Sequence, residues 1–252
     1  MIALLVALCA SIVGAISGIG GGVIIKPLLD LSGNYSTAVI SILSSATVFS
    51  MSAAALFKHY RLHTKFDIKF ATYIAISSMI GGLLGQSLLS SLLKFDNIPI
   101  KQIQNFVLMI LLIIVLIYMN KFKEKYHWHL KNPLAPILVG IFFGFLSAFL
   151  GIGGGPINLV ALTLFFSMNT KSASVISVFM IFFSQASKLS QVLLTQSYVG
   201  LDLVALLYMI PAGIVGGLIG SKLNHQFTEK QIHNLFNIVL CFVIITTAIN
   251  LF

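Results

Sequence analysis

Long apolar runs alternate with short polar or basic stretches along the whole chain. Eight of these runs are long enough to be membrane segments. They cover roughly residues 2–31, 37–57, 70–93, 103–119, 134–166, 172–194, 203–223 and 232–252. A segment that crosses a bilayer needs about 20 apolar residues, and its backbone must satisfy its own hydrogen bonds. The pattern therefore predicts an all-α, polytopic integral membrane protein with eight hydrophobic helical segments.

Composition supports this interpretation and excludes a soluble protein. Charged residues make up only 8% of the 252, against about 25% in soluble domains, and the mean hydropathy is +1.03. The net charge of +9 comes from basic residues between apolar runs, where they indicate topology and not a nucleic-acid partner. We expect a multi-pass protein of the cell (plasma) membrane, surrounded by the lipid bilayer. Cys9 and Cys241 lie in apolar runs, so we expect buried thiols.

Three short motifs occur twice, in the same order. They are the glycine-rich clusters at 18–22 and 151–155, the Gly-Gly-x-x-Gly motifs at 81–85 and 216–220, and the Lys-Gln-Ile motifs at 101–105 and 230–234, displaced by 133, 135 and 129 residues. The chain is therefore predicted to contain two four-segment membrane repeats, at 1–120 and 134–252, joined by a basic loop at 121–133. Such repeats are usual in secondary transporters, whose substrate site lies between them near the midplane. A duplication that merely stabilises a bundle is the alternative.

The first and fifth segments exceed the usual length of a span, and each carries a glycine cluster near its middle. A glycine costs about 1 kcal/mol relative to alanine inside a helix, so we expect both segments to be broken there. Each segment either spans as two half-helices or enters and returns as a re-entrant hairpin. With two hairpins, only Lys94 and Lys101 would lie outside, which obeys the positive-inside rule better and makes the repeats inverted.

Unwound glycine backbone exposes N–H groups, and the N-terminus of the following helix adds partial positive charge. Pro156 directly follows the second cluster, and proline favours the first turn of a helix. Two such breaks facing each other could bind a small anion. Glycines also permit close helix packing, and we assign that role to the Gly-Gly-x-x-Gly motifs.

A polar stretch at 184–191 interrupts the apolar run of the sixth segment. It contains Lys188, the only basic residue well inside an otherwise uninterrupted span, which favours a functional role over snorkelling. Hydroxyls of the second segment could bind anion oxygens or bond to their own helix carbonyls. The candidate substrate-binding residues are Gly18, Gly20, Gly21, Gly22, Lys26, Ser44, Ser45, Thr47, Gly151, Gly153, Gly154, Gly155, Pro156, Asn158, Ser184, Gln185 and Lys188.

Carboxylates and histidines fall in predicted loops or at segment ends. This disfavours a metal site and a carboxylate proton relay, and motifs for ATP hydrolysis and metalloproteolysis are missing from the sequence. We expect no enzyme activity, no cofactor and no metal. Coupling to protons would then depend on a weakly acidic substrate that carries its own proton. The sequence leaves open whether the protein forms a homo-oligomer.

The glycine clusters, the proline after the second, the Gly-Gly-x-x-Gly pairs, the duplication and the size together resemble the sulfite exporter TauE/SafE family, also called the toluene sulfonate uptake permease family. The resemblance covers essentially the whole chain. It implies secondary transport, with export favoured, of small sulfur-containing or organic anions such as sulfite or sulfonates. Val23 follows the first cluster where a proline follows the second, so the two halves need not bind equivalently. A passive anion channel and a non-transporting membrane scaffold are the alternatives.

Overall fold

The computed structural model describes residues 2–64, 66–92, 100–123, 125, 128, 130, 132, 134–150 and 154–249, and within them all regular structure is helical. The helices are α1 (Ile2–Ser17), α2 (Gly22–Ser32), α3 (Thr37–Arg61), α4 (Ile68–Leu92), α5 (Ile100–Ile117), the π-helix η1 (Tyr118–Phe122), α6 (Ala135–Leu150), α7 (Gly155–Phe166), α8 (Thr170–Leu194), α9 (Leu206–Gln226) and α10 (Glu229–Ile249). Six stretches in this part of the chain are long and apolar enough to cross a membrane: α3, α4, α5 with η1, α8, α9 and α10. The protein is a multi-pass membrane protein.

The four shorter helices form two pairs, and each pair is interrupted at a glycine cluster. Gly18 and Gly20, between α1 and α2, have φ angles of +74° and +76°, and Gly154, directly before α7, has a φ angle of +96°. These left-handed conformations favour glycine because the Cβ atom of any other residue makes them sterically strained. The helix breaks that the glycine content predicts are therefore present, one between α1 and α2 and the other between α6 and α7. Gly151 and Gly153 lie outside the described residues.

Helices α1 and α2 form a hairpin that returns to the end from which it came. Gly216 of α9 faces Ser11 and Gly220 faces Ile12, so α1 and α9 run in the same direction. After the break, α2 leads back to the start of α3. This geometry is that of a re-entrant hairpin, which is tolerated at membrane depth where it is buried in protein or lines a cavity.

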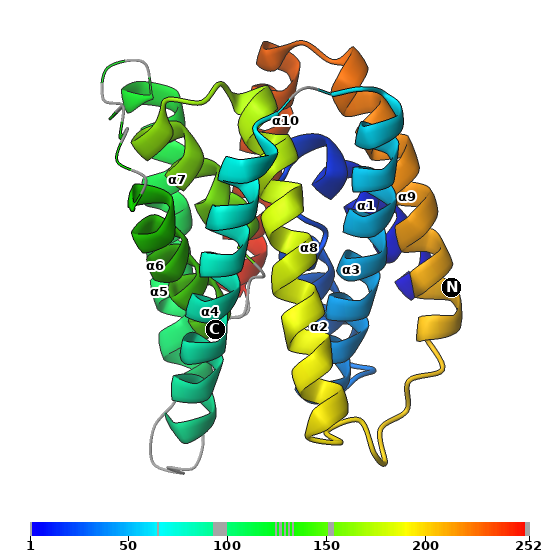
Figure 1. The fold of residues 1–252 in the computed structure, drawn as a ribbon. Coiled ribbons are helices and arrows are strands. Elements are labelled where there is room, and N and C mark those ends of the chain that lie inside the picture. Colours follow the sequence, from blue (N-terminus) through cyan, green and yellow to red (C-terminus); the bar gives the residue numbers. More distant parts are fainter. Residues whose placement is uncertain are drawn as a thin grey trace.

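Helices α6 and α7 form a second hairpin that enters from the opposite end. Gly81 of α4 lies against Ile141 of α6, so these helices run together, and the rings of Phe70 and Phe166 lie 4.8 Å apart. The end of α7 is thus beside the start of α4. In Figure 1, α4 to α7 lie on one side of α8, whereas α1, α3 and α9 lie on the other.

Basic residues gather at one end of the bundle, which we name the basic end. Its members at the ends of described helices are Lys58, Arg61, Lys69, Lys121, Lys123, Lys171, Lys222 and Lys230. Here the Lys123 Nζ atom lies 3.0 Å from Glu229 Oε1, and the same carboxylate oxygen accepts a hydrogen bond from the N–H of Thr170. This network joins the ends of η1, α8 and α10.

The helix bounds in the second half follow those in the first. Helices α1 and α6 begin at residues 2 and 135, and α3 and α8 begin at 37 and 170, which is the displacement of 133 that separates the glycine clusters. Ser36 and Asn169 cap α3 and α8 with the same φ of −67° and ψ of 155°. The predicted halves interleave in space, because α4 packs on α6 and α9 packs on α1 and α3.

Candidate functional site

A polar cavity lies beside the tip of the α1–α2 hairpin, between α3, α4, α6 and α8; we name it the central cavity. Its polar lining consists of Gly20, Gly22, Ser44, Ser45, Gln86, Ser147, Ser184, Gln185, Ser187, Lys188 and Gln191. Its volume, counted as room for the centres of water molecules, is about 50 Å³, several times the roughly 10–15 Å³ that one water needs on that measure. The space suits a few waters or a small ion.

Four polar residues on the wall of this cavity are largely buried and make no side-chain hydrogen bond within the described part of the chain. Ser44, Ser45, Ser147 and Gln185 are only 7%, 3%, 4% and 5% exposed, yet their side chains make no hydrogen bond to any described residue. Their polar atoms are not among the fully buried atoms without a partner, so they are open to the cavity, where water or a ligand can reach them. A bound polar ligand or ordered water in the cavity would satisfy all four.

Other hydroxyls of α3 behave differently, which separates the two roles that the sequence left open. The hydroxyls of Thr47 and Ser52 donate to the carbonyls of Leu43 and Phe49 on their own helix, at 2.7 and 2.9 Å. Thr47 also faces Gly213 of α9. Within this cluster, position on the helix decides the role: Ser44 and Ser45 face the cavity, whereas Thr47 bonds its own backbone.

The start of α2 also borders this region. Gly20 and Gly22 line the cavity, and Gly21, the N-cap of α2, has no side chain with which to cap the helix. The first N–H groups of a helix have no partner within it, and they carry the positive end of the helix dipole. The start of α2 is therefore suited to a negatively charged ligand.

Two carbonyl groups at the same break already accept hydrogen bonds. Ser177 Oγ donates to the Gly18 carbonyl at 2.6 Å, and Asn224 Nδ2 donates to the Ile16 carbonyl at 2.6 Å. These two carbonyls are satisfied by α8 and α9, so they do not compete with an anion for the donors that line the cavity. Of the described residues that line it, none is acidic.

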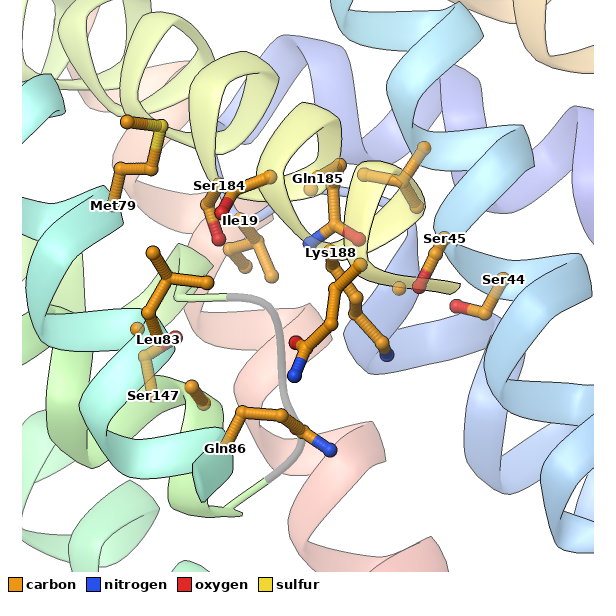
Figure 2. A pocket seen from close by; sticks show the side chains of 17 residues that line it. Ile19, Ser44, Ser45, Met79, Leu83, Gln86, Ser147, Ser184, Gln185 and Lys188 are labelled. Atoms are coloured by element: carbon orange, nitrogen blue, oxygen red, sulfur yellow. The ribbon is translucent and has the colours of Figure 1, made fainter. Parts of the chain in front are cut away.

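Figure 2 shows Lys188 of α8 and Gln86 of α4 reaching into the same space, with Ser44 and Ser45 on the wall formed by α3. Lys188 is partly buried, and its accessible surface lies along the cavity. Its ammonium supplies a fixed positive charge that the neutral hydroxyls and amides around it do not neutralise. These groups together can bind an anion through one charge and several hydrogen-bond donors.

The other candidates from the first hairpin lie beside the cavity and not in it. Gly18 packs against Ser174, and Gly21 packs against the Ala10 carbonyl of α1. Both serve the turn and its close packing. Lys26 borders a neighbouring pocket that shares Gly22 with the central cavity.

The tip of the second hairpin, between α6 and α7, contacts the tip of the first hairpin, between α1 and α2. The Cα of Gly155 lies directly against the backbone of Ile19, so the two breaks touch. Pro156 lies in the first turn of α7, where the sequence places it. Asn158 is 2% exposed, and its Oδ1 is buried without a partner in the described structure. Gly154 lies between Asn158 and Ser147.

Four polar lining residues were not among the sequence candidates: Gln86, Ser147, Ser187 and Gln191. Gln86 and Ser147 carry a usable signal, because each is a polar residue next to a glycine motif inside an apolar run. Ser187 and Gln191 lie within the polar stretch that drew attention to Lys188. An uncharged polar residue inside a membrane segment is a weaker signal than a charge, but here it marks the same cavity.

Aromatic rings lie on the α8 segment that precedes the cavity residues, toward the basic end. The rings of Phe66 and Phe179 are 6.1 Å apart, those of Phe179 and Phe183 are 5.1 Å apart, and Phe49 stacks on Phe182 at 5.0 Å. The cavity residues of α8 occupy its second half, away from the basic end. In this conformation the cavity is nearer to the opposite end of the protein. No group of three or more His, Cys, Asp or Glu side chains that could hold a metal ion occurs among the residues that the structure describes.

A polar cavity at the junction of two interrupted helices is where secondary transporters bind their substrates. The fold and the cavity thus define the protein as a membrane transporter that acts on a small-molecule substrate. A family model described as "Sulfite exporter TauE/SafE" matches residues 3–247, and the chain belongs to this family.

Curated relatives carry names of the same kind. The chain is 26% identical over 232 residues to the "Probable membrane transporter protein YjnA" of Bacillus subtilis (strain 168), covering 86% of this chain and 87% of the relative. It is 24% identical to YunE of the same organism, with coverage of 96% and 95%. It is 26% identical to MJ0441 of Methanocaldococcus jannaschii, with coverage of 94% and 91%. Both are also named probable membrane transporter proteins, so the names indicate transport and not enzyme activity.

Proposed function

We propose that the protein is a secondary transporter that exports a small sulfur-containing or organic anion, such as sulfite or a sulfonate, and that the anion binds in the central cavity. The observation that carries the proposal is the group of buried side chains on the cavity wall without protein hydrogen bonds. Ser44, Ser45 and Gln185 border the cavity and make no side-chain hydrogen bond to the described residues, which supports a role in binding a ligand.

Charge selects an anion over a cation or a neutral solute. The ammonium of Lys188 and the start of α2 are positive, and the cavity wall in the described part of the chain carries no carboxylate to balance them. A charged ligand that enters a partly buried site must be paired there, because an unpaired charge is costly to bury. An oxyanion, which accepts several hydrogen bonds, pairs with Lys188 and uses the hydroxyl and amide donors around it.

We further propose that the two halves are inverted repeats and that the basic end is cytoplasmic. The hairpins return to opposite ends of the bundle, and the helix bounds repeat at the displacement of the glycine clusters. Basic residues accumulate at cytoplasmic loops of membrane proteins. The cavity in this conformation then lies nearer the outside, and coupling to protons through a weakly acidic substrate stays part of the proposal.

The decisive experiment is a thermal-shift screen of the purified protein with sulfite, sulfate, thiosulfate, sulfonates and carboxylates. We expect saturable stabilisation by at least one of these anions, loss of that response in Lys188→Ala, and an unchanged response in the exposed control Lys69→Ala. A hydrogen bond to a charged group contributes about 1.5–3 kcal/mol, so Ser45→Ala should weaken the apparent affinity about tenfold or more.

Ser52→Ala is the matched control, because Ser52 is equally buried on α3 but bonds its own helix. Its anion response should equal that of the unmodified protein. Equal responses from Ser45→Ala and Ser52→Ala, or an undiminished response in Lys188→Ala, would show that the anion binds elsewhere. Flux into proteoliposomes that saturates with anion concentration distinguishes a transporter from a channel.

A further inference from the structure

A second polar pocket lies on the other side of α2, between that helix, α5 and α10; we name it the α2–α10 pocket. It shares Gly22 with the central cavity and is bordered by Val23, Asp30, Asn105 and Thr247. Its volume, on the same measure as before, is about 40 Å³, which leaves room for an ion with one or two waters. The anion proposal makes no use of these residues.

The pocket presents oxygen atoms that the protein does not use. Thr247 is only 4% exposed, and among the described residues its hydroxyl has no hydrogen-bond partner. Asn105, which also borders the pocket, makes no side-chain hydrogen bond to the described part of the chain. Threonine in a helix usually bonds the carbonyl one turn earlier, as its neighbour Thr246 does with Val243. The Thr247 hydroxyl is therefore available to a ligand in the pocket.

A backbone carbonyl is also released here by a proline. Pro27 lies inside α2 and has no N–H, so the Val23 carbonyl, one turn earlier, lacks its normal helical partner. Val23 borders the pocket. Carbonyls freed at interrupted half-helices are the groups that coordinate coupling cations in transporters.

Charge favours a monovalent cation. Asp30 is the only carboxylate that borders the pocket in the described structure, and it lies in the last turn of α2, where the helix dipole is negative. Divalent cations are usually bound by several carboxylates or by substrate phosphates. Lys26, which has an interaction of its own, also borders the pocket, and its ammonium offsets the charge of Asp30.

We propose that the α2–α10 pocket binds Na⁺ through oxygen atoms of Val23, Asp30, Asn105 and Thr247, and that this site couples the ion to the anion of the proposed function. One short helix then serves both ligands: its first residue borders the anion cavity, and its later residues Val23 and Asp30 border the cation pocket. Because opposite charges on two sides of α2 attract each other, Na⁺ should raise the apparent affinity for the anion.

The test is a thermal-shift titration of the purified full chain with NaCl, with choline chloride and KCl at equal ionic strength. We expect saturable stabilisation by Na⁺ alone, and its loss in Asp30→Asn. Thr247→Val should weaken the apparent Na⁺ affinity roughly tenfold or more, the loss typical of a metal-site partner. Thr246→Val is the matched control and should titrate like the unmodified protein, as should Thr247→Ser, which keeps the hydroxyl. Lys26→Met should strengthen Na⁺ binding, because it removes a like charge.

Equal responses to Na⁺ and choline, or identical titrations of Thr247→Val and Thr246→Val, would overturn the Na⁺ site. So would stabilisation by acid in Na⁺-free buffer that Asp30→Asn abolishes while Na⁺ has no effect, because the pocket would then take a proton. The anion screen in the same preparation separates the two proposals. A Lys188-dependent anion response without a Na⁺ response refutes only the cation site, and the converse refutes only the anion site.

Discussion

Replacing Gly155 by alanine perturbs the point where the two hairpins touch. Gly155 does not have a positive φ, so the sign of φ does not exclude alanine, and its position as the first residue of α7 offers no interior gain in helix propensity. The added methyl group, however, would overlap the backbone of Ile19. The Ile19 Cα is 2.6 Å from the methyl position and the Ile19 carbonyl is closer still, whereas real Cβ atoms essentially never approach another atom within 3.0 Å.

Backbone atoms cannot rotate away, so the two hairpin tips must separate. Overpacking of a well-packed core costs about 1–3 kcal/mol, and overlap with a main chain belongs at the upper end of that range. The expected loss is therefore about 2–3 kcal/mol. For a chain of this size that lowers the melting temperature by roughly 4–12 °C.

Thermal unfolding of the purified protein measures this loss, and Gly82→Ala is the matched control. The nearest atoms to its added methyl, Ala148 Cβ and the Gly144 carbonyl oxygen, lie 3.9 Å away, which is ordinary contact. We expect Gly82→Ala to be as stable as the unmodified protein or slightly more stable. Equal melting temperatures for Gly155→Ala and Gly82→Ala would refute the tip-to-tip contact.

Three further predictions concern other parts of the fold. Ser177→Ala removes the buried donor to the Gly18 carbonyl and should cost about 1–3 kcal/mol in unfolding free energy; an unchanged melting temperature would show that the carbonyl finds another donor. Glu229→Gln removes the ion pair with Lys123, which is partly exposed, so we expect a loss of at most about 1 kcal/mol that shrinks at high salt. A tag fused after Phe252 should be reached by impermeant protease from outside intact cells, because α10 ends opposite the basic end; protection of the tag would reverse the topology.

Most features of the fold that the sequence predicted correctly depend on glycines. Their clusters predict breaks because glycine is poor in helices and free to adopt positive φ, and both breaks are found. The Gly-Gly-x-x-Gly motifs predict close helix contact, and Gly81 and Gly216 do lie against α6 and α1. These predictions succeed because they depend on the size of one side chain and not on its neighbours.

The faces of the helices could not be predicted, and the reason is the solvent. Lipid is as apolar as a protein core, so an apolar run does not reveal which side faces inward. Cys9 and Cys241, expected to be buried, are exposed on the surface of the bundle. Ser45 and Ser52 lie on one helix in a similar sequence context, and only the packing of α3 shows that Ser45 faces the cavity.

The two hairpin helices have unequal anchoring, and this bears on how binding could drive transport. Helix α1 is fixed along its length against α9, and its last carbonyls are held by Asn224 and Ser177. Helix α2 is shorter, is interrupted by Pro27, and borders both polar pockets. A ligand shifts a conformational equilibrium only by binding one state better than the other. Since charge on either side of α2 changes its energy more than that of α1, we expect α2 to be the element whose position responds to the substrate.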